Sequence, residues 1–221
     1  MPPDYPFSVD AFRSRVEERF ESRADILEAV GGDHLLNPDY AEALNERTFK
    51  RAAVLMPVID RDGEASVLMT QRTAHLSAHS GQIAFPGGKI DPGETPEQAA
   101  LREAHEEVGL DPDYVDVIGT FGDYFSGSGF QVAPVVGLVK DGFSLTRNEA
   151  EVAHIFEVPL SFLMTADNHS LETWTFNGKE RHLYAMPWRD ETLDPPAEWR
   201  IWGLTAGIIA MVQDRLYGGA T

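Results

Sequence analysis

One segment constrains this chain more than any other, the glycine-rich turn and helix FPGGKIDPGETPEQAALREAHEEVGL at residues 85–110. Thr95, Pro96 and Gln98 form a strong helix start, because threonine caps the first turn, proline fits the first helical position and glutamine completes the capping box. Gly109 predicts the end of the same helix. The segment therefore predicts a tight glycine-rich loop that leads into a well-delimited helix.

Three glutamates crowd the last turns of that helix, where the helix dipole disfavours negative charge. Glu103 and Glu107 lie one turn apart, and Glu106 projects from the side of the same strip. Each loses roughly 0.3–1 kcal/mol to the dipole, and the Glu103/Glu107 pair adds a few tenths of repulsion. Either the strip is an ordinary solvated face, or a hard divalent cation such as Mg²⁺ or Mn²⁺ gathers the carboxylates. Apolar residues at helical spacing predict the face that meets a sheet: Leu101, Ala104 and Val108.

The composition is that of an acidic globular protein. The 221 residues, 43% of them hydrophobic, suffice for one well-buried core. The formal net charge is −18, from 36 Asp and Glu against 18 Lys and Arg. No cationic run is present, so we expect no binding to nucleic acid or to an anionic membrane. The absence of cysteine excludes disulfides, thiolate catalysis and cysteine-based metal sites.

The first ten residues, MPPDYPFSVD, have neither the basic nor the apolar region of a secretory signal. The longest apolar run, at residues 52–59, is far too short to cross a bilayer. We therefore expect a cytoplasmic protein. The oligomeric state stays open, with a homodimer as one alternative.

The order of elements predicts a mixed sheet with helices packed on it. A helix near the N-terminus should begin at a Ser8 cap and bury Phe12, Val16 and Phe20. Asn177 and Gly178 predict a tight hairpin turn. A second helix is expected at residues 203–216. Strands are predicted at residues 52–59, 65–72, 114–121, 130–139, 151–158, 171–176 and 182–186.

The helix segment resembles the signature of the Nudix hydrolases, G-x5-E-x7-R-E-U-x-E-E-x-G-U, where U is a bulky aliphatic residue. Ala104 at the first U is the one departure, and it is a packing position. The resemblance implies an α+β fold, a Nudix-type α/β/α sandwich with a mixed β-sheet between helices. It divides the chain into an N-terminal helical extension at 1–47, a Nudix domain at 48–215 and a short tail at 216–221. The matching residues are Gly88, Glu94, Arg102, Glu103, Glu106, Glu107 and Gly109.

The resemblance also implies roles for these residues around a Mg²⁺ or Mn²⁺ cofactor. Glu103 and Glu107 resemble the principal metal ligands, with Glu106 and the Gly88 carbonyl as further ligands. Glu94 and Arg102 resemble the pair that braces the loop against the helix. The expected catalytic set is thus Glu106, Glu107, Arg102 and Glu94, acting on a diphosphate.

Residues 68–88 resemble the signature of the coenzyme A pyrophosphatase branch, L-L-T-x-R-[SA]-x3-R-x3-G-x3-F-P-G-G. Met69, Thr73 and Ser77 depart from it, and Ser77 stands where the pattern has arginine. The resemblance implies cleavage of coenzyme A to 3′,5′-ADP and 4′-phosphopantetheine. The matching residues are Leu68, Thr70, Arg72, Gly81, Phe85, Pro86, Gly87 and Gly88.

Other residues are weaker candidates, each with an ordinary structural alternative. Arg72 and Gly87 are candidate substrate contacts, although an arginine at a strand end is as often a surface charge. Glu149 and Glu151 are candidates for a general base or a further ligand. His75 and His79 lack helical periodicity and are expected in an exposed loop. Two aromatic residues could stack on adenine or line the pantetheine path, or belong to the core: Phe125 and Phe130.

Three functions remain open from the sequence. The first is hydrolysis of coenzyme A or its derivatives. The second is Nudix hydrolysis of another nucleoside diphosphate derivative, such as ADP-ribose, NADH or a dinucleoside polyphosphate, which the Ser77 departure keeps open. The third is a non-catalytic Nudix-fold binding module, which is disfavoured because every carboxylate of the signature is present.

Overall fold

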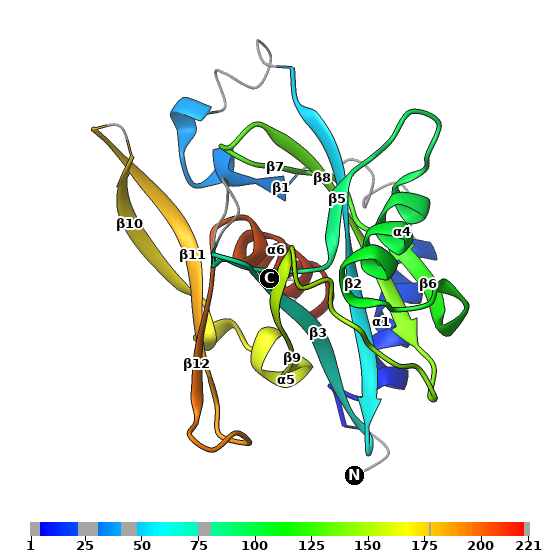
Figure 1. Cartoon of the computed structure of the whole chain (residues 1–221). Coiled ribbons are helices and arrows are strands. Elements are labelled where there is room, and N and C mark those ends of the chain that lie inside the picture. The colour runs from blue at the N-terminus through cyan, green and yellow to red at the C-terminus, as the bar shows by residue number, and fades with distance from the viewer. Residues whose placement is uncertain (1–4, 22–30, 41–47, 75–80, 177, 219–221) are drawn as a thin grey trace.

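The computed structural model describes residues 5–21, 31–40, 48–74, 81–176 and 178–218. A mixed sheet forms the centre of the molecule (Figure 1). Strands β2 (Lys50–Arg61) and β8 (Phe130–Val139) run parallel at its middle. Strand β3 (Glu64–Arg72) returns antiparallel to β2, and the two strands confirm those predicted at 52–59 and 65–72. The long buried runs in these strands explain their central place, because both faces of the sheet are covered.

Shorter strands extend this sheet on both sides. Among the described residues the main sheet has nine strands. Strand β9 pairs with β3, and β6 pairs with β8 across a register shift. The remaining strands are β1 (Gly31–Gly32), β4 (Ile83–Ala84), β5 (Gly87–Lys89), β6 (Val115–Thr120), β7 (Tyr124–Phe125) and β9 (Val152–Pro159).

Helices cover the two faces of the main sheet, which confirms the predicted α/β/α sandwich. Helix α4 (Pro96–Val108) packs Ala104 and Val108 against one face. Helices α1 (Val9–Glu21) and α6 (Leu204–Tyr217) contribute to the core on the other face. The shorter helical segments are α5 (Leu160–Leu163), η1 (Asp33–Leu35), η2 (Pro112–Tyr114) and η3 (Ala166–Asn168). No helix of the described ranges is long and apolar enough to cross a bilayer.

A second, three-stranded sheet stands beside the main one. Its strands are β10 (Ser170–Phe176), β11 (Lys179–Asp190) and β12 (Ala197–Trp202), all antiparallel. The predicted β10–β11 hairpin is confirmed, although Asn177 at its tip lies outside the described residues. Strand β12 was not predicted, because the sequence AEWRIW carries several large polar residues among its apolar ones. The second sheet matters below because it forms a wall of the main cavity.

Residues before 48 contribute a strand of the main sheet as well as helix α1. Ser8 Oγ accepts a hydrogen bond from the Ala11 N–H at 3.2 Å, as a capping residue should, and Phe12 and Val16 are fully buried. The side chain of Phe20 lies outside the described part of the structure. Strand β1 pairs in parallel with β7, so the N-terminal region also adds a strand to the edge of the main sheet.

Candidate active site

Helix α4 has the ends that the sequence predicts. The Thr95 side chain accepts from the Gln98 N–H, and the Gln98 side chain accepts from the Thr95 N–H, which completes a capping box. Gly109 adopts a left-handed conformation with φ of 70° and donates its N–H to His105 O. These caps fix where the helix starts and stops, and thereby where its three glutamates project.

Arg102 is the centre of an ion-pair network on the exposed side of α4. Its Nε and Nη2 donate to the two carboxylate oxygens of Glu94 at 2.8 and 3.0 Å. Its Nη1 donates to Glu103 at 3.0 Å and to Glu106 at 3.3 Å. The Arg102 guanidinium, helped by the Asp91 N–H, lowers the pKa of Glu94 to about 2. Arg102 therefore offsets much of the negative charge at this end of the helix and holds the Glu94 loop against it.

Glu107 has a different environment, although it lies on the same helix. Its side chain is only 5% exposed. One carboxylate oxygen accepts from the Gly87 N–H at 3.2 Å, and the other faces Arg72 Nη1 at 3.4 Å. Burial raises the pKa of Glu107 to about 7, and the repulsion of nearby Glu103 and Glu151 adds to the rise. The contacts with the Gly87 N–H and Arg72 lower the pKa but do not offset burial.

Glu103 lies directly against the glycine loop. A Cβ added to Gly88 would come within 2.3 Å of the Glu103 carboxyl carbon. Only glycine leaves room for a carboxylate there. Burial raises the pKa of Glu103, while Arg102 opposes the rise. By contrast, the Glu106 side chain is 55% exposed.

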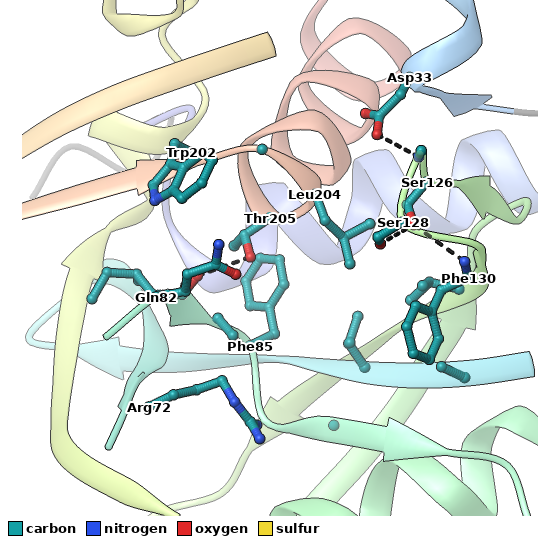
Figure 2. Close-up of a pocket in the computed structure, with 18 of the residues that line it drawn as sticks. Asp33, Arg72, Gln82, Phe85, Ser126, Ser128, Phe130, Trp202, Leu204 and Thr205 are labelled. Carbon is teal, nitrogen blue, oxygen red and sulfur yellow. Dashed lines mark hydrogen bonds between the residues drawn. The ribbon is translucent and has the colours of Figure 1, made fainter. Parts of the chain in front are cut away.

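Glu103 and Glu107 border a cavity of about 570 Å³ that lies between the two sheets and the start of α6 (Figure 2). The side at helix α4 carries Arg72, Glu103 and Glu107, whereas Asp33 and Arg181 reach the cavity from the N-terminal region and the second sheet. The rest of the lining is largely apolar or hydroxyl-bearing. Its volume is in the usual range for a small-molecule site. The ionisable residues at the cavity are Asp33, Arg72, Lys89, Glu103, Glu107, Glu151 and Arg181.

The structure brings most of the predicted site residues together and separates a few. Arg72, Gly87, Gly88 and Glu151 all border the cavity. The Asn148 side-chain amide donates to Glu151 at 3.3 Å.

The aromatic residues, Glu149 and the residues of the loop before Gly81 differ in where they lie. Phe130 borders the cavity, whereas Phe125 packs edge-on against Phe49 and lies outside the described lining. Glu149 is 80% exposed and pairs with Arg147. His75, Ser77 and His79 fall outside the described residues.

Part of the cavity wall comes from residues that the sequence did not single out. The N-terminal region contributes Asp33, which accepts from the Tyr124 hydroxyl at 2.6 Å and from the Gly127 N–H at 2.8 Å. The second sheet contributes Phe176, Arg181, Leu183 and Trp202. Alternation along β10 and β11 was the available signal, but the sequence does not say which face of that sheet meets the cavity.

The carboxylate donors fit a hard divalent cation. Glu107 is buried and Glu103 is half-buried, and the pKa values of both are raised, which indicates that the protein groups around them do not balance their charge. A small dication bound by oxygen ligands would supply that balance. In the described ranges no three acidic or histidine side chains already converge as a ligand set. One carboxylate oxygen of Glu103 and one of Glu106 instead accept from Arg102.

Comparisons with known proteins agree with this site. The family model of the NUDIX domain matches residues 49–193. A Citrobacter koseri protein named "Uncharacterized Nudix hydrolase NudL" is 41% identical over 178 residues, which cover 79% of this chain and 86% of that protein. A Yersinia enterocolitica protein of the same name is 42% identical over 161 residues, which cover 72% and 77%.

Among solved structures, the Nudix hydrolase RenU of M. smegmatis overlaps 51% of this chain and 72% of its own, with 28% identity and a TM-score of 0.42. That overlap is too partial to inform the geometry of the site. The family match, in contrast, spans the strands, the glycine loop and helix α4 that form the ionisable side of the cavity. The chain therefore belongs to the Nudix hydrolase family.

Proposed function

We propose that this Nudix hydrolase cleaves the diphosphate of coenzyme A or its derivatives, to give 3′,5′-ADP and 4′-phosphopantetheine. The observation that carries the proposal is the joining of two features in one cavity. Carboxylates suited to a diphosphate-bound cation border the same space as a long apolar and hydroxyl-bearing wall. Coenzyme A needs both, because its diphosphate links a nucleotide to a long uncharged arm. The resemblance of residues 68–88 to the coenzyme A pyrophosphatase branch supports the same choice.

The residues that would hold Mg²⁺ or Mn²⁺ are Glu103 and Glu107, with Glu106 and the Gly88 carbonyl as further ligands. When bound, the ion neutralises the diphosphate, polarises phosphorus and lowers the pKa of a bound water. Gly88 keeps space for the Glu103 carboxylate. Arg102 donates to both carboxylate oxygens of Glu94 and to the Lys89 carbonyl, and so holds the loop against the helix.

The chain's own groups supply the remaining chemistry. Arg72 borders the cavity beside Glu107, and its guanidinium is placed to bind a phosphate oxygen. The Gly87 N–H donates into the same place. We assign Glu151 as the group that accepts the proton of the attacking water, because it lines the cavity and its negative charge helps to raise the pKa values of Glu103 and Glu107.

The catalytic unit in this proposal is the domain at 48–215. The extension at 1–47 supplies wall residues, since Asp33 and Tyr40 border the cavity. We place the protein in the cytoplasm, and a homodimer stays an open alternative.

The alternative is the same chemistry on another nucleoside diphosphate derivative, such as ADP-ribose, NADH or a dinucleoside polyphosphate. A solved Nudix domain from Shewanella oneidensis NrtR is described in complex with ADP-ribose. A non-catalytic binding module is the least favoured reading, because the carboxylates Glu103, Glu106 and Glu107 are all present on α4.

One assay decides between these substrates. The protein is incubated with Mg²⁺ or Mn²⁺ and a panel of coenzyme A, ADP-ribose, NADH and a dinucleoside polyphosphate, and the products are identified by mass. We expect 4′-phosphopantetheine from coenzyme A, at a kcat/KM at least about 10-fold above the rest of the panel. Rapid turnover of ADP-ribose with no product from coenzyme A would overturn the proposal in favour of the alternative.

A further inference from the structure

One face of the second sheet is turned toward the cavity. In an antiparallel sheet, residues directly opposite one another and residues two apart on a strand share a face. Trp174 pairs with Arg181, and Phe176 lies two residues on from Trp174 along β10. Trp202 pairs with Ala185, which lies an even number of residues from Arg181 along β11. The wall residues Phe176, Arg181 and Trp202 therefore lie on the same face, and part of this face borders the cavity.

This face carries an ordered set of parallel aromatic rings. The Trp174 and Trp202 rings lie 5.1 Å apart between centroids at an interplanar angle of 6°. Trp174 and Phe176 lie 6.2 Å apart at 13°. Trp174 is fixed in turn, because its Nε1 donates to Glu172 at 2.9 Å and the Arg200 guanidinium lies 5.0 Å from its ring centroid. Trp202 is thus a ring whose orientation is set before any ligand arrives.

Trp202 lies on the side of the cavity that also holds Arg72. Figure 2 shows its indole above Gln82, with Arg72 below, while Ser126, Ser128 and Phe130 lie on the opposite side. Arg72 in turn contacts Glu107. With the diphosphate at Arg72 and the carboxylates, Trp202 offers a base a flat ring on the same side of the cavity. The arm beyond the diphosphate would point toward Phe130 and the serines.

We propose that Trp202 is the stacking platform for the nucleobase of the substrate. This inference rests on the proposed diphosphate hydrolysis at the same site, and it adds the direction in which the substrate lies. A flat heteroaromatic ring fits a pre-oriented indole, because stacking between a base and an aromatic side chain needs no specific hydrogen bond. Trp202 is a positioning residue, since it touches the base and not the reacting phosphorus.

The test measures binding of separate halves of the substrate to the full chain. Affinities for 3′,5′-ADP, ribose 5-phosphate and 4′-phosphopantetheine are measured by calorimetry with Mg²⁺ present, in the wild type and in Trp202→Leu and Trp202→Phe. For 3′,5′-ADP we expect Trp202→Leu to weaken binding by about 5- to 100-fold, and Trp202→Phe to restore it to within about 5-fold. The two ligands without a base should change by less than about 2-fold.

Trp199→Phe provides a matched control. Trp199 lies on the opposite face of the second sheet, because it pairs with Trp188 on β11, and its ring stacks on Phe156 at 4.3 Å between centroids. Its substitution should leave 3′,5′-ADP affinity unchanged. In steady state, Trp202→Leu should raise KM for the adenine-containing substrate while kcat falls by less than about 3-fold. A purely structural defect would instead lower kcat without raising KM.

The outcomes separate this inference from the proposed function. Equal 3′,5′-ADP affinity in wild type and Trp202→Leu would overturn the stacking role even if coenzyme A is hydrolysed. No measurable binding of 3′,5′-ADP to the wild type would overturn it as well. Base-dependent loss of affinity in Trp202→Leu, in a protein that hydrolyses ADP-ribose and leaves coenzyme A intact, would support the stacking role and overturn the proposed substrate.

Discussion

At the scale of single residues, helix α4 and the loop before it hold carboxylates in opposite electrostatic states. Arg102 stabilises the ionised Glu94 and lowers its pKa to about 2. Burial disfavours the ionised Glu107 and raises its pKa to about 7. The first group is a structural anion that is always charged near neutral pH, whereas the second is poised to exchange a proton for a cation. The same residue type therefore serves as a brace at one position and as a candidate ligand at the other.

Glu107→Gln should separate function from stability. We expect metal-dependent hydrolysis to fall by about 100-fold or more, since an amide is a poor ligand for a hard cation. Because the pKa of Glu107 is higher in the folded than in the unfolded chain, the wild-type apoprotein loses stability as pH rises from about 4.5 to above 7. The neutral variant should therefore be more stable than wild type in EDTA at pH 8, by roughly 1–3 kcal/mol, and the advantage should shrink at pH 5.

Urea unfolding at the two pH values measures this difference. Glu198→Gln is the control, because Glu198 is 75% exposed and pairs with Arg189 on the second sheet. Its free energy of unfolding should change by less than about 0.5 kcal/mol. Full hydrolytic activity in Glu107→Gln would count against the ligand assignment.

At the scale of elements, helix α4 and the glycine loop act as one part. The capping box and Gly109 delimit the helix, and Arg102 Nη2 donates to Lys89 O at 3.1 Å, which ties the helix to strand β5. Strand β5 itself pairs with β2 at the centre of the main sheet. The candidate ligands are therefore held by elements anchored to the centre of the main sheet, while the second sheet provides another wall of the cavity.

Gly88→Ala tests the close contact between loop and helix. The added Cβ would overlap the Glu103 carboxylate, which must then move. We expect metal affinity and activity to fall by about 10- to 100-fold, with little change in stability without metal, because the displaced atoms end a flexible side chain. In a Glu103→Gln background, the same glycine substitution should add less than about 3-fold, since both changes act through one carboxylate. Independent, multiplying losses in the double variant would show that Gly88 acts in another way.

At the scale of the whole molecule, the acidic balance and the site are linked. A chain with net charge −18 repels a polyanionic substrate. A bound dication reverses the local sign where the substrate diphosphate must lie. The ionised state of Glu107 should therefore govern how strongly the folded protein takes up metal.

Metal titration should accordingly stabilise the fold in a pH-dependent way. At about 100 times the dissociation constant, Mg²⁺ should add about 2.7 kcal/mol, which raises Tm by roughly 5–10 °C for a chain of this size. The rise should be larger at pH 8 than at pH 6, because protonation of Glu107 below about pH 7 competes with the ion. Thermal unfolding with NaCl at matched ionic strength controls for screening. An equal rise in Glu107→Gln would show that the ion binds elsewhere.

The sequence by itself determined the local parts of this protein. The caps of α4, the i, i+4 placement of Glu103 and Glu107, the hairpins and the central strands all follow from contacts between residues close along the chain. The signature residues were recognisable for the same reason, because their spacing is a property of one loop and one helix.

Only the tertiary structure decided what surrounds those parts. The burial of Glu107 depends on Arg72 from β3 and on the β5 backbone, and Asp33 and Trp202 reach one cavity from near opposite ends of the chain. Strand β12 and the face of the second sheet that meets the cavity had no decisive local signal, since alternation predicts two faces without saying which is inside. Local spacing determined which groups could carry the chemistry, and long-range packing decided their protonation and the substrate space around them, because burial and proximity arise only once distant segments meet.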